Sequence, residues 1–533
     1  MSSWQCNLCT HTYDETKESA RWDALSADWV CPICGSPKTS FTSIKPQKTV
    51  IDRNARKAEE PVKLFRYECG LCSFVYDEGK ESRSWPDLGD NWPCPVCGSG
   101  KNNFKTISEV QQKQSQSGLG HVDVEVAYLS EWQRPSDDFE SHMTDIHNMA
   151  VSGKSQSGPM RTQVETTSWD DILFKGAQLF KLPLNKSHPV QTKTVIGQSA
   201  KSPMILDTPL IVSHMSFGAL SKEAKIALSK GSAKAKTAMS SGEGGILPES
   251  LENAHKYIFE YVPNKYSATD ENFSLVDAVE IKIGQSAKPG MGGHLPGHKV
   301  TREIARIRGV REGKDITSPS SFPDIRNLDD LKQTVEMLRE KTGGKPVGIK
   351  LAAGHLEEDV KIAISAGVDF ITIDGRAGGT GSAPKVVKNS ASIPTIYALA
   401  RARKILDDIQ ADHVSLIITG GLRMSSDFAK ALAMGADAIA LGTTLMMALG
   451  CQQYRVCDTG KCPVGIATQD PKLRARLDVD QSAARVANFF KAATEEIKDF
   501  ARLSGNHDVH FLNDSDICTT NTEISNHTNI QHV

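Results

Sequence analysis

The residues of this chain most capable of chemistry are its cysteines, because their spacing is that of metal ligands. Eight of the twelve lie in the first hundred residues as four Cys-x-x-Cys pairs: Cys6 with Cys9, Cys31 with Cys34, Cys69 with Cys72, and Cys94 with Cys97. Two such pairs facing each other place four thiolates around one ion in tetrahedral geometry. No basic-then-apolar N-terminal segment indicates a secretory signal, so we interpret the pairs as metal sites rather than disulfides.

The pairs belong to two copies of one pattern. In each copy 21 residues separate the two pairs, a Tyr-Asp follows the first pair, and a Trp (Trp22 or Trp85) precedes the second. The second pair opens a Cys-Pro-x-Cys-Gly run with a Lys and a Phe close behind. Copies this short bury little apolar surface, so a metal must hold each one together.

This combination resembles rubredoxin over about 40 residues in each copy. The resemblance implies one mononuclear iron in residues 1–45 and another in residues 64–108. The loop between the pairs is shorter than in a standard rubredoxin, and Thr10 and Ser73 stand where that family usually has glycine. Zinc ribbons use the same four thiolates, so zinc is the alternative metal.

Three more cysteines, Cys451, Cys457 and Cys462, follow the last predicted strand, with a proline after the third. Five residues separate the first two and four the last two. Three thiolates at this spacing fit an iron–sulfur cluster in which one iron lacks a cysteine ligand. Cys518 stands alone, and we interpret it as an ordinary thiol rather than a fourth ligand.

The segment that must position these groups has the pattern of a barrel. From residue 209, short β-branched runs alternate with amphipathic helices, which predicts βα units. Eight units over roughly 250 residues predict an α/β fold, a (β/α)8 TIM barrel over residues 201–480 preceded by the two small domains. We place the strands at Leu210–Ser216, Thr237–Ser241, Ala278–Gln285, Asp315–Ser318, Val347–Ala352, Phe370–Asp374, Ser415–Thr419 and Ala438–Leu441.

Helices and linkers complete the predicted organisation. Leu328–Lys341 is predicted as a helix because its leucine and valine residues recur on one face. Polar stretches suit linkers, and the remaining segments are a connector with some helix and a C-terminal helix with a polar tail. These are the linkers 46–63 and 111–118, the connector 109–200 with a helix around Trp169–Leu179, and the tail 481–533 with the helix Ala483–Leu503.

The amino-acid composition and net charge limit the classes of protein to which this chain can belong. A hydrophobic content of 39% and a charged content of 24% are those of a globular chain, and the net charge of −2 gives no reason to expect a nucleic-acid or membrane partner. The most apolar stretch, residues 431–450, fits a buried barrel strand with its flanks better than a membrane span. We therefore expect a cytoplasmic protein.

The glycine-rich segments of the predicted barrel resemble the FMN-binding domain of glutamate synthases. They are Met215–Ser221, Ser241–Gly245, Lys282–Gly290, Leu295–Gly297, Asp374–Gly381 and Thr419–Leu422. With the cysteine segment 450–470, the match runs from about residue 145 to 530 and is nearest to the short archaeal-type branch and the synthase domain of the large subunit. The resemblance implies FMN and favours a 3Fe–4S over a 4Fe–4S cluster.

The residues themselves suggest where a flavin would bind. Barrels commonly hold a phosphate at the loops after strands seven and eight, which here contain glycines that let backbone N–H groups approach a ligand. Lys350 lies in an apolar strand, where a charge needs a partner; the resemblance places it beside the flavin, and an ordinary ion pair is the alternative. The expected cofactor-binding residues are Met215, Ser216, Ser241, Gln285, Lys350, Asp374, Gly378, Gly379, Gly420, Gly421, Gly442 and Thr443.

The resemblance also implies a site for a diacid. Lys288 and Arg308 resemble the family's dicarboxylate-binding pair, and Arg suits a bidentate carboxylate clamp. A solvated helix surface shared with Arg302 and Arg306 is the alternative for Arg308. The substrate-binding residues expected are Gln285, Lys282, His294 and Arg308.

Glu243 and Lys288 are the expected catalytic residues. Glu243 resembles the family glutamate near the flavin, which suggests proton transfer or ammonium handling. Met291 and His294 stand where larger synthases have glutamate and glutamine, so the 2-oxo acid and the arrival of ammonia could differ from theirs.

The resemblance implies an oxidoreductase acting on CH–NH2 donors (EC 1.4). Electrons would pass from the rubredoxin-like irons through the iron–sulfur cluster to FMN, which would reduce 2-iminoglutarate, formed from 2-oxoglutarate and ammonia, to L-glutamate. One alternative is a related reductive aminase, such as one that makes N-methylglutamate. Others are a flavin–iron electron-transfer protein without amination, and an FMN barrel with zinc ribbons as docking modules.

Two sequence features bear on partners. Amidotransferases of this family start at a processed N-terminal cysteine, whereas this chain starts Met-Ser-Ser-Trp, so we expect free ammonia or a separate glutamine amidotransferase subunit. The glycine clusters do not open a helix in a dinucleotide unit, so NAD(P)H is expected to act through a separate reductase. We also expect a homo-oligomer.

Overall fold

The computed structural model describes residues 3–6, 12–14, 20–26, 28–32, 36–44, 64–69, 75–77, 84–89, 92–94, 100–110 and 139–533. Two compact units divide the chain, Met1–Ile44 with Ser155–Val533 as one and Lys45–Lys154 as the other. The predicted linkers 46–63 and 111–118, together with Thr10, Ser73, Cys9, Cys34, Cys72 and Cys97, lie outside the described residues.

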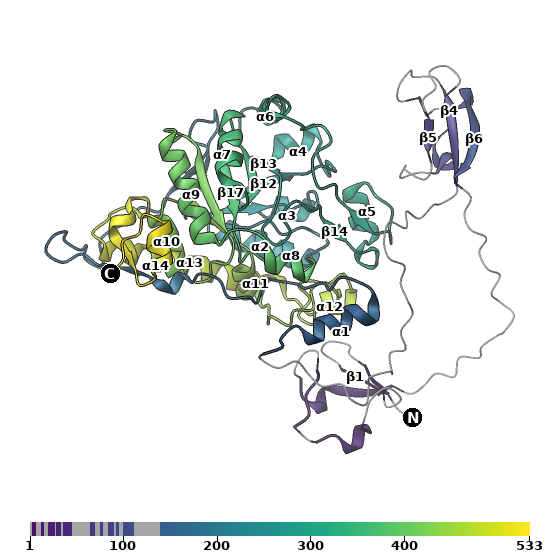
Figure 1. The fold of residues 1–533 in the computed structure, drawn as a ribbon, viewed down its shortest axis with the longest axis horizontal. Helices are drawn as coiled ribbons and strands as arrows, with labels where there is room; N and C mark the ends of the chain where they lie inside the picture. Colours follow the sequence, from purple (N-terminus) through teal and green to yellow (C-terminus); the bar gives the residue numbers. More distant parts are fainter. Residues whose placement is uncertain are drawn as a thin grey trace. The chain divides into compact units, whose positions relative to one another are not determined.

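A closed barrel of parallel strands forms the centre of the first unit and confirms the predicted fold class (Figure 1). Its strands, in order, are β10 (Leu210–Val212), β11 (Ala238–Ser240), β12 (Lys256–Tyr261), β13 (Ala278–Lys282), β16 (Val347–Ala352), β17 (Phe370–Asp374), β18 (Ser415–Thr419) and β19 (Ala438–Leu441). The barrel closes where Leu210 pairs with Ile439. The last three strands are buried at every position, as expected of strands covered on both faces.

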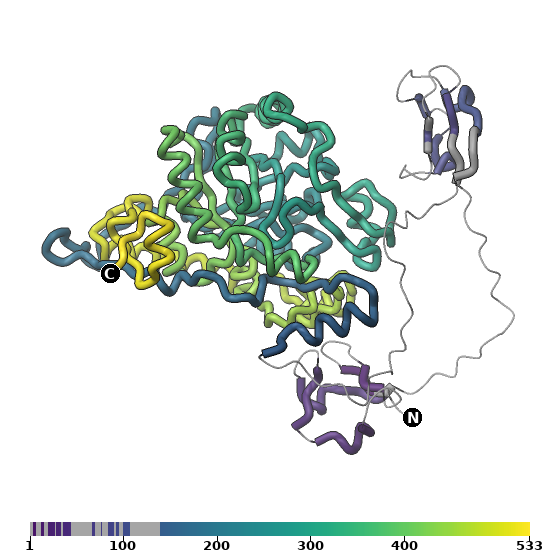
Figure 2. The backbone as a smooth tube through the Cα atoms, in the orientation of Figure 1, coloured from purple at the N-terminus to yellow at the C-terminus, as the bar shows by residue number. Residues whose placement is uncertain are grey.

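Helices follow the strands and surround the barrel (Figure 2). The helix predicted at Leu328–Lys341 has those bounds as α6; the Asn327 side chain accepts a hydrogen bond from the Asp330 N–H at its start, and its predicted apolar face is buried. The other helices are α2 (Lys222–Lys234), α3 (Pro248–Glu252), α4 (Asp270–Leu275), α5 (Arg302–Arg308), α7 (Leu356–Ser365), α8 (Lys385–Ser390), α9 (Thr395–Asp408), α10 (Ser425–Ala433), α11 (Thr443–Leu449), α12 (Pro471–Arg474) and α13 (Val479–Leu503).

One predicted barrel strand is wrong. Asp315–Ser318 was expected as the fourth strand, but only Ile316–Thr317 (β15) is extended, and it pairs with β14 (His294–Leu295) in a separate two-stranded sheet. The strand that the prediction lacks is β12, which lies between β11 and β13 in the barrel. Its charged Lys256 and Glu260 interrupt the apolar run by which a buried strand is usually identified.

The connector also differs from expectation, whereas the predicted C-terminal helix Ala483–Leu503 is confirmed within α13. Trp169–Leu179 is not a helix: a 3-10 turn at Trp169–Asp171 leads into strand β7 (Ile172–Phe174), which pairs with β20 (Ile517–Thr519) near the C-terminus. The tail is therefore tied to the connector by a two-stranded sheet. The remaining elements are α1 (Met143–Ser152), the hairpin β8 (Thr194–Ile196) and β9 (Met204–Leu206), and α14 (Thr522–His527).

The two Cys-x-x-Cys copies fold alike. The first has β1 (Ser3–Cys6), β2 (Thr12–Asp14) and β3 (Phe41–Ile44) in the order β2-β1-β3, and the second has β4 (Leu64–Cys69), β5 (Val75–Asp77) and β6 (Phe104–Val110) in the order β5-β4-β6. One cysteine of each of the four pairs is described, and all four are buried: Cys6, Cys31, Cys69 and Cys94.

Aromatic rings and one lysine form the interior of each copy. In the first copy the Trp22 ring lies 5.0 Å from Phe41 and 5.5 Å from Trp29, between ring centroids. The Lys38 ammonium donates to the Leu25 carbonyl at 2.7 Å and lies 5.5 Å from the centre of the Trp22 ring. The second copy repeats this arrangement, so the lysine of the sequence repeat covers the aromatic cluster in both.

No helix in the part of the chain that the structure describes is long and apolar enough to span a membrane. The apolar stretch 431–450 ends helix α10, forms strand β19 and continues into α11.

The contact between α2 and α13 is tight enough to be tested. A methyl group on Gly231 would lie 2.5 Å from a methyl carbon of Val486. We predict that Gly231→Ala lowers the melting temperature, because overpacking costs about 1–3 kcal/mol and outweighs a helix-propensity gain of about 1 kcal/mol. Thermal unfolding followed by circular dichroism measures the effect. Adding Val486→Ala as a control should remove the penalty, and an unchanged or higher melting temperature for the single variant would contradict the proposed clash.

Candidate functional site

A cavity of about 200 Å³ opens at the carboxyl ends of the barrel strands. This is the end of a (β/α)8 barrel at which ligands bind. The expected catalytic, cofactor-binding and substrate-binding residues that line the cavity are Met215, Ser216, Glu243, Lys282, Gln285, Lys288, His294, Arg308, Lys350, Asp374, Gly378, Gly379, Gly420, Gly421, Gly442 and Thr443. Ser241 is not among the lining residues; its hydroxyl is buried, donates to the Gly242 carbonyl and accepts from the Glu260 N–H.

One end of the cavity suits an anion. Gly420 and Gly421 have φ angles of 118° and 93°, a conformation that favours glycine and leaves the backbone uncovered. Arg423 lines the cavity beside them, and burial together with the charge of Arg161 lowers its pKa to about 10. Two neighbouring guanidinium groups are most stable with an anion between them, so this end fits a phosphate. Neither arginine was identified from the sequence.

Lys350 occupies the floor of the cavity. It lies in β16 with 4% of its surface exposed, and its ammonium lies 3.6 Å from an oxygen of Glu260 in β12. The expectation that a buried lysine needs a partner is thus met by an ion pair inside the barrel. Nearby, Asp374 at the end of β17 accepts a hydrogen bond from the Ser286 hydroxyl at 2.7 Å. Its position is fixed by that contact.

Glu243 and Lys282 form an ion pair in the wall of the cavity. Burial alone would raise the pKa of Glu243, but the Lys282 ammonium, with a hydrogen bond from Ser318 and the charge of Lys288, lowers it to about 2. The same pairing outweighs burial and raises the pKa of Lys282. A side chain on Gly293 would collide with the Glu243 carboxylate, so the glycine there permits the close approach.

Three further cationic or polar groups expected to bind substrate lie at different depths. Lys288 is 6% exposed and donates to the Gly292 carbonyl at 3.0 Å, and burial lowers its pKa. His294, in β14, is more open and lies 3.2 Å from Asp315. Gln285 donates to the Thr380 hydroxyl at 3.3 Å and accepts from Lys282 at 3.0 Å.

Arg308 differs from the other arginines of α5. Its guanidinium donates to the Phe217 carbonyl at 2.7 Å, stands 5.5 Å from the Tyr266 ring, and lines the cavity, whereas Arg302 and Arg306 are exposed. Its Nε has no hydrogen bond among the described residues, and burial lowers its pKa. Arg308 is therefore placed to bind an anion in the cavity.

A second cavity, of about 140 Å³, shares part of its wall with the first. Glu243, Lys282 and Gly293 line both cavities. The rest of its wall is largely apolar and includes Met291 and Phe322. The Glu243–Lys282 pair thus separates an open cavity from a smaller one with apolar sides.

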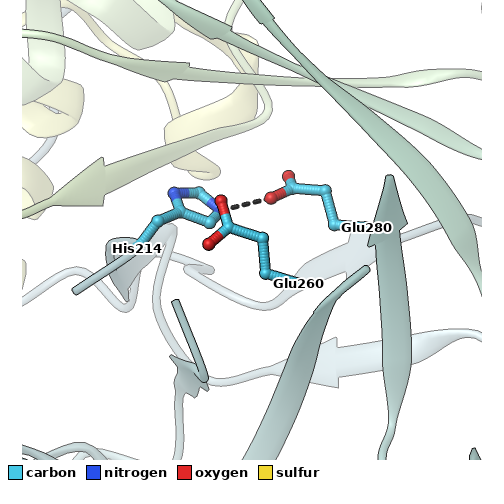
Figure 3. Close-up of side chains that lie close together, drawn as sticks. All are labelled: His214, Glu260 and Glu280. Atoms are coloured by element: carbon cyan, nitrogen blue, oxygen red, sulfur yellow. Dashed lines mark ion pairs between the residues drawn. The ribbon is translucent and has the colours of Figure 1, made fainter. Parts of the chain in front are cut away.

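The site contains a buried cluster that sequence reasoning missed (Figure 3). His214, in the loop after β10, meets Glu260 of β12 and Glu280 of β13, with ligand atoms of the three residues within 4.8 Å of one another. His214 and Glu260 also line the cavity. A signal was available, because Glu260 and Glu280 interrupt apolar strands as Lys350 does.

The three-cysteine segment borders the same cavity. Cys457 and Asp458 line it, and Cys462 is buried. Burial, followed by the neighbouring Cys462 and Cys451, raises the pKa of Cys457 to about 12, so these thiols are close enough to interact. Thiolate ligands require compensation by a bound cation.

The sulfurs of Cys451, Cys457 and Cys462 do not all lie within 4.8 Å of one another. Among the described residues, only His214, Glu260 and Glu280 bring three potential ligand atoms within 4.8 Å of one another. Two thiolates on one tetrahedral ion lie about 3.8 Å apart, because each metal–sulfur bond is about 2.3 Å. Wider spacing fits a cluster of several irons. Gln453 and Arg455 hold φ angles of 60° and 56°, which bends the backbone around the thiols.

Two family profiles match the chain. One, described as a conserved region in glutamate synthase, matches residues 141–507, and one described as rubredoxin matches residues 3–41 and 66–104. The first covers more than half of the chain.

Curated relatives agree with these profiles. The chain is 41% identical over 330 residues to an archaeal glutamate synthase (NADPH) of Methanocaldococcus jannaschii, covering 61% of this chain and 64% of that protein. It is 34% identical over 411 residues to a glutamate synthase large subunit-like protein of Rhizobium meliloti, covering 73% and 93%. It is 37% identical over 344 residues to an archaeal-type glutamate synthase (NADPH) of Thermotoga maritima, covering 64% and 66%. The match spans slightly less than two thirds of the two archaeal-type relatives.

Among solved structures, a mutant of mandelate oxidase with an FMN adduct matches at a TM-score of 0.43 and 16% identity. The match covers 64% of this chain and 86% of that chain.

The three thiols lead to a prediction about sulfide. We expect Cys457→Ser to remove most of the acid-labile sulfide from the purified protein, because a cluster with three cysteine ligands loses one of its anchors. Sulfide and iron analysis of the anaerobically purified protein measures this. Cys518→Ser is the matched control and should leave the sulfide unchanged; loss of sulfide in the control would make Cys518 a ligand, and no loss in Cys457→Ser would exclude the cluster.

Proposed function

The chain belongs to the glutamate synthase family, and from this premise we propose that it is an FMN-dependent oxidoreductase that aminates 2-oxoglutarate to L-glutamate. The observation that carries the proposal is the combination in one cavity of an anion-binding end, at Gly420, Gly421 and Arg423, with a second cationic pair, Lys288 and Arg308. A flavin phosphate and a diacid are the two anions that such a cavity would need to bind together.

The residues present fit FMN. Gly420, Gly421, Gly442 and Thr443 with Arg423 would hold its phosphate, and Lys350 would face its ring from the cavity floor. Met215, Ser216, Gln285, Asp374, Gly378 and Gly379 would complete the contacts. Bound FMN would supply a hydride donor, while the chain orients the substrate and controls the protons.

Two cations would bind the substrate carboxylates. Arg308 offers a guanidinium whose Nε still lacks a hydrogen bond among the described residues, and Lys288 offers a buried ammonium. Because burial lowers the pKa of Lys288, this group gives up a proton more readily than an exposed lysine does. We assign Lys288 to carboxylate binding and to proton donation at the carbonyl oxygen, which leaves as water when ammonia adds. His294, less buried, would contribute at the open side.

Glu243 would handle the nitrogen. With its pKa held at about 2, Glu243 is a carboxylate at neutral pH and cannot serve as a proton donor there. An anion beside the substrate favours a cation, so Glu243 would attract ammonium and stabilise the positive charge of the imine. Its place between the two cavities supports entry of the nitrogen donor through the smaller one.

The iron centres would supply electrons. The two rubredoxin modules imply iron, and the cysteine segment at the cavity would carry an iron–sulfur cluster, for which we propose the 3Fe–4S type. Two relatives are described as NADPH enzymes, and we propose that NAD(P)H reaches this chain through a separate reductase. The many cysteines proposed as metal ligands must stay reduced, which requires a reducing compartment, so we propose the cytoplasm.

A second nitrogen donor is favoured by one observation. The smaller cavity is bounded by apolar side chains, including Met291 and Phe322, which could accommodate a methyl group. Methylamine, giving N-methylglutamate, is therefore the alternative donor.

The proposed reaction can be tested without knowledge of the natural electron donor. The protein is reduced anaerobically with dithionite, mixed with 2-oxoglutarate and ammonium, and examined for flavin reoxidation and for glutamate. We expect one glutamate for each flavin reoxidised. Parallel reactions with methylamine and glutamine rank the nitrogen donors, and a flavin that stays reduced with all three would refute the assignment.

Arg308 provides a test of the substrate site. Lysine cannot make the bidentate contact of a guanidinium, so Arg308→Lys should raise the KM for 2-oxoglutarate by about 10- to 100-fold with a smaller change in kcat. Steady-state kinetics at saturating ammonium measures both constants. Arg306→Lys, on the same helix but exposed, is the matched control and should leave both unchanged. Equal effects in the two variants would argue that Arg308 does not contact substrate.

A further inference from the structure

His214, Glu260 and Glu280 form a cluster of titratable groups inside the barrel, which we call the inner triad (Figure 3). The side chains are 3%, 1% and 1% exposed, respectively. The His214 imidazole points at Glu280, and the two are joined by an ion-pair contact from Nε2 to Oε2. None of the roles assigned above to substrate or phosphate binding uses these residues.

Some polar atoms of the inner triad have a polar neighbour outside the triad, while others have no hydrogen bond among the described residues. One oxygen of Glu280 accepts a hydrogen bond from the Thr372 hydroxyl at 2.5 Å, and the Ser213 hydroxyl lies 3.3 Å from His214 Nδ1. His214 Nε2, the other Glu280 oxygen and both Glu260 oxygens have no hydrogen bond among the described residues. His214 Nε2 and that Glu280 oxygen contact each other, and Glu260 Oε1 lies 3.6 Å from the Lys350 ammonium, so Glu260 Oε2 is the atom with neither a hydrogen bond nor an ion pair among the described residues. A carboxylate oxygen this deeply buried is expensive without a partner, which calls for a function.

The charges that face the inner triad come from four elements. Lys350 of β16 pairs with Glu260. Lys225 of α2, whose pKa burial lowers to about 7, interacts electrostatically with the same carboxylate. Lys225 is held by the carbonyls of Met215, Ser240 and Ser241. Lys282 of β13 and Asp374 of β17 also lie within electrostatic range, but Lys282 pairs with Glu243 and Asp374 with the Ser286 hydroxyl.

Lys225, with its pKa at about 7, can also change charge, but it does not line the cavity, whereas His214 does. With Lys225 protonated and the His214 imidazole neutral, the two carboxylates Glu260 and Glu280 are balanced by the ammonium groups of Lys350 and Lys225. A divalent metal would add two positive charges to a balanced set, so the inner triad does not suit one. One negative charge arriving nearby would instead favour one added proton.

We propose that His214 is a redox-linked proton acceptor, which takes up a proton at Nε2 when the bound flavin gains electrons and releases it when the flavin is reoxidised. His214 and Glu260 line the cavity in which the flavin would lie, so added charge on the ring would act on the inner triad at short range. Glu280, fixed by Thr372, is placed to stabilise the imidazolium.

The step balances. Two electrons and one proton enter the flavin, giving it one extra negative charge, and a second proton enters His214, so the whole site keeps its charge. When a hydride leaves, the two electrons and the flavin's proton leave together, and His214 returns its own proton. Burial alone would raise the pKa of Glu280, but a positive charge on His214 and its contact with the carboxylate, together with Lys350 and Thr372, lower it, as a partner of an imidazolium requires.

The inference rests on the flavin binding put forward under Proposed function but needs neither 2-oxoglutarate nor ammonia. The flavin midpoint potential of the holoenzyme is measured by spectroelectrochemistry from about pH 6 to 9, without substrate. Each proton taken up with two electrons contributes about 30 mV per pH unit, because a tenfold change in a two-electron equilibrium equals that potential. We expect about 60 mV per pH unit for the native protein and about 30 mV per pH unit for His214→Asn.

Two further variants make the test specific. Glu280→Gln removes the stabilising charge and should also reduce the slope toward one proton, while His413→Asn, at an exposed position, should keep the native slope. Flavin content and circular dichroism check that each variant is folded, and Glu280→Gln carries the test if His214→Asn does not fold. A native slope of one proton for two electrons, or an unchanged slope in both inner-triad variants, would overturn the proposal. If the slopes change but no glutamate forms, only the proposed reaction is wrong.

Discussion

Charges buried at the mouth of a barrel need counter-charges, and this requirement organises the whole site. Glu243 pairs with Lys282 and Glu260 with Lys350, while Glu280 contacts the His214 imidazole; in each case the two residues come from different strands of the barrel or the loops that follow them. Once these pairs are made, four cavity-lining cations have no carboxylate ion pair among the described residues: Lys288, Lys299, Arg308 and Arg423. Lys299 donates to the Cys457 carbonyl, and the other three occupy the places where a phosphate and a diacid are proposed to bind. The internal pairs and the ligand sites are thus parts of one charge balance.

The iron modules depend on a different constraint. Each has a three-stranded sheet and a small aromatic cluster, which is too little apolar surface to stabilise a domain of this size alone. Metal bonds to the buried cysteines would supply the rest, which would make folding and metal binding one process in these modules. The cysteine segment after β19 is different, because the barrel supports it and its Cys457 reaches the cavity. Only this third centre has a described position beside the proposed flavin.

Much of this arrangement could be predicted from the sequence, for identifiable reasons. Strands β16 to β19 have the predicted bounds because apolar and β-branched residues dominate them, although Lys350 interrupts β16, and α6 does because its apolar residues keep helical spacing. The residues around the cavity were found through a family resemblance, which identifies single positions but not their contacts. Arg161 and Arg423 were missed because only the fold brings them together. Trp169–Leu179 was misassigned because its partner strand β20 lies more than 300 residues away.

The most informative failure is β12, because the residue that hid the strand also builds the inner triad. Glu260 breaks the apolar run of β12 and is 1% exposed, with neither oxygen hydrogen-bonded among the described residues. A carboxylate there costs stability that an apolar or amide side chain would not, so packing alone gives no reason for it. The same argument applies to Glu280 of the adjacent strand β13: Glu260 lines the cavity, and Glu280 contacts His214, which also lines it. A sequence that departs from the usual pattern for no packing reason is expected to do so at a functional site. Here the departure marks a cluster of buried titratable groups next to the proposed cofactor.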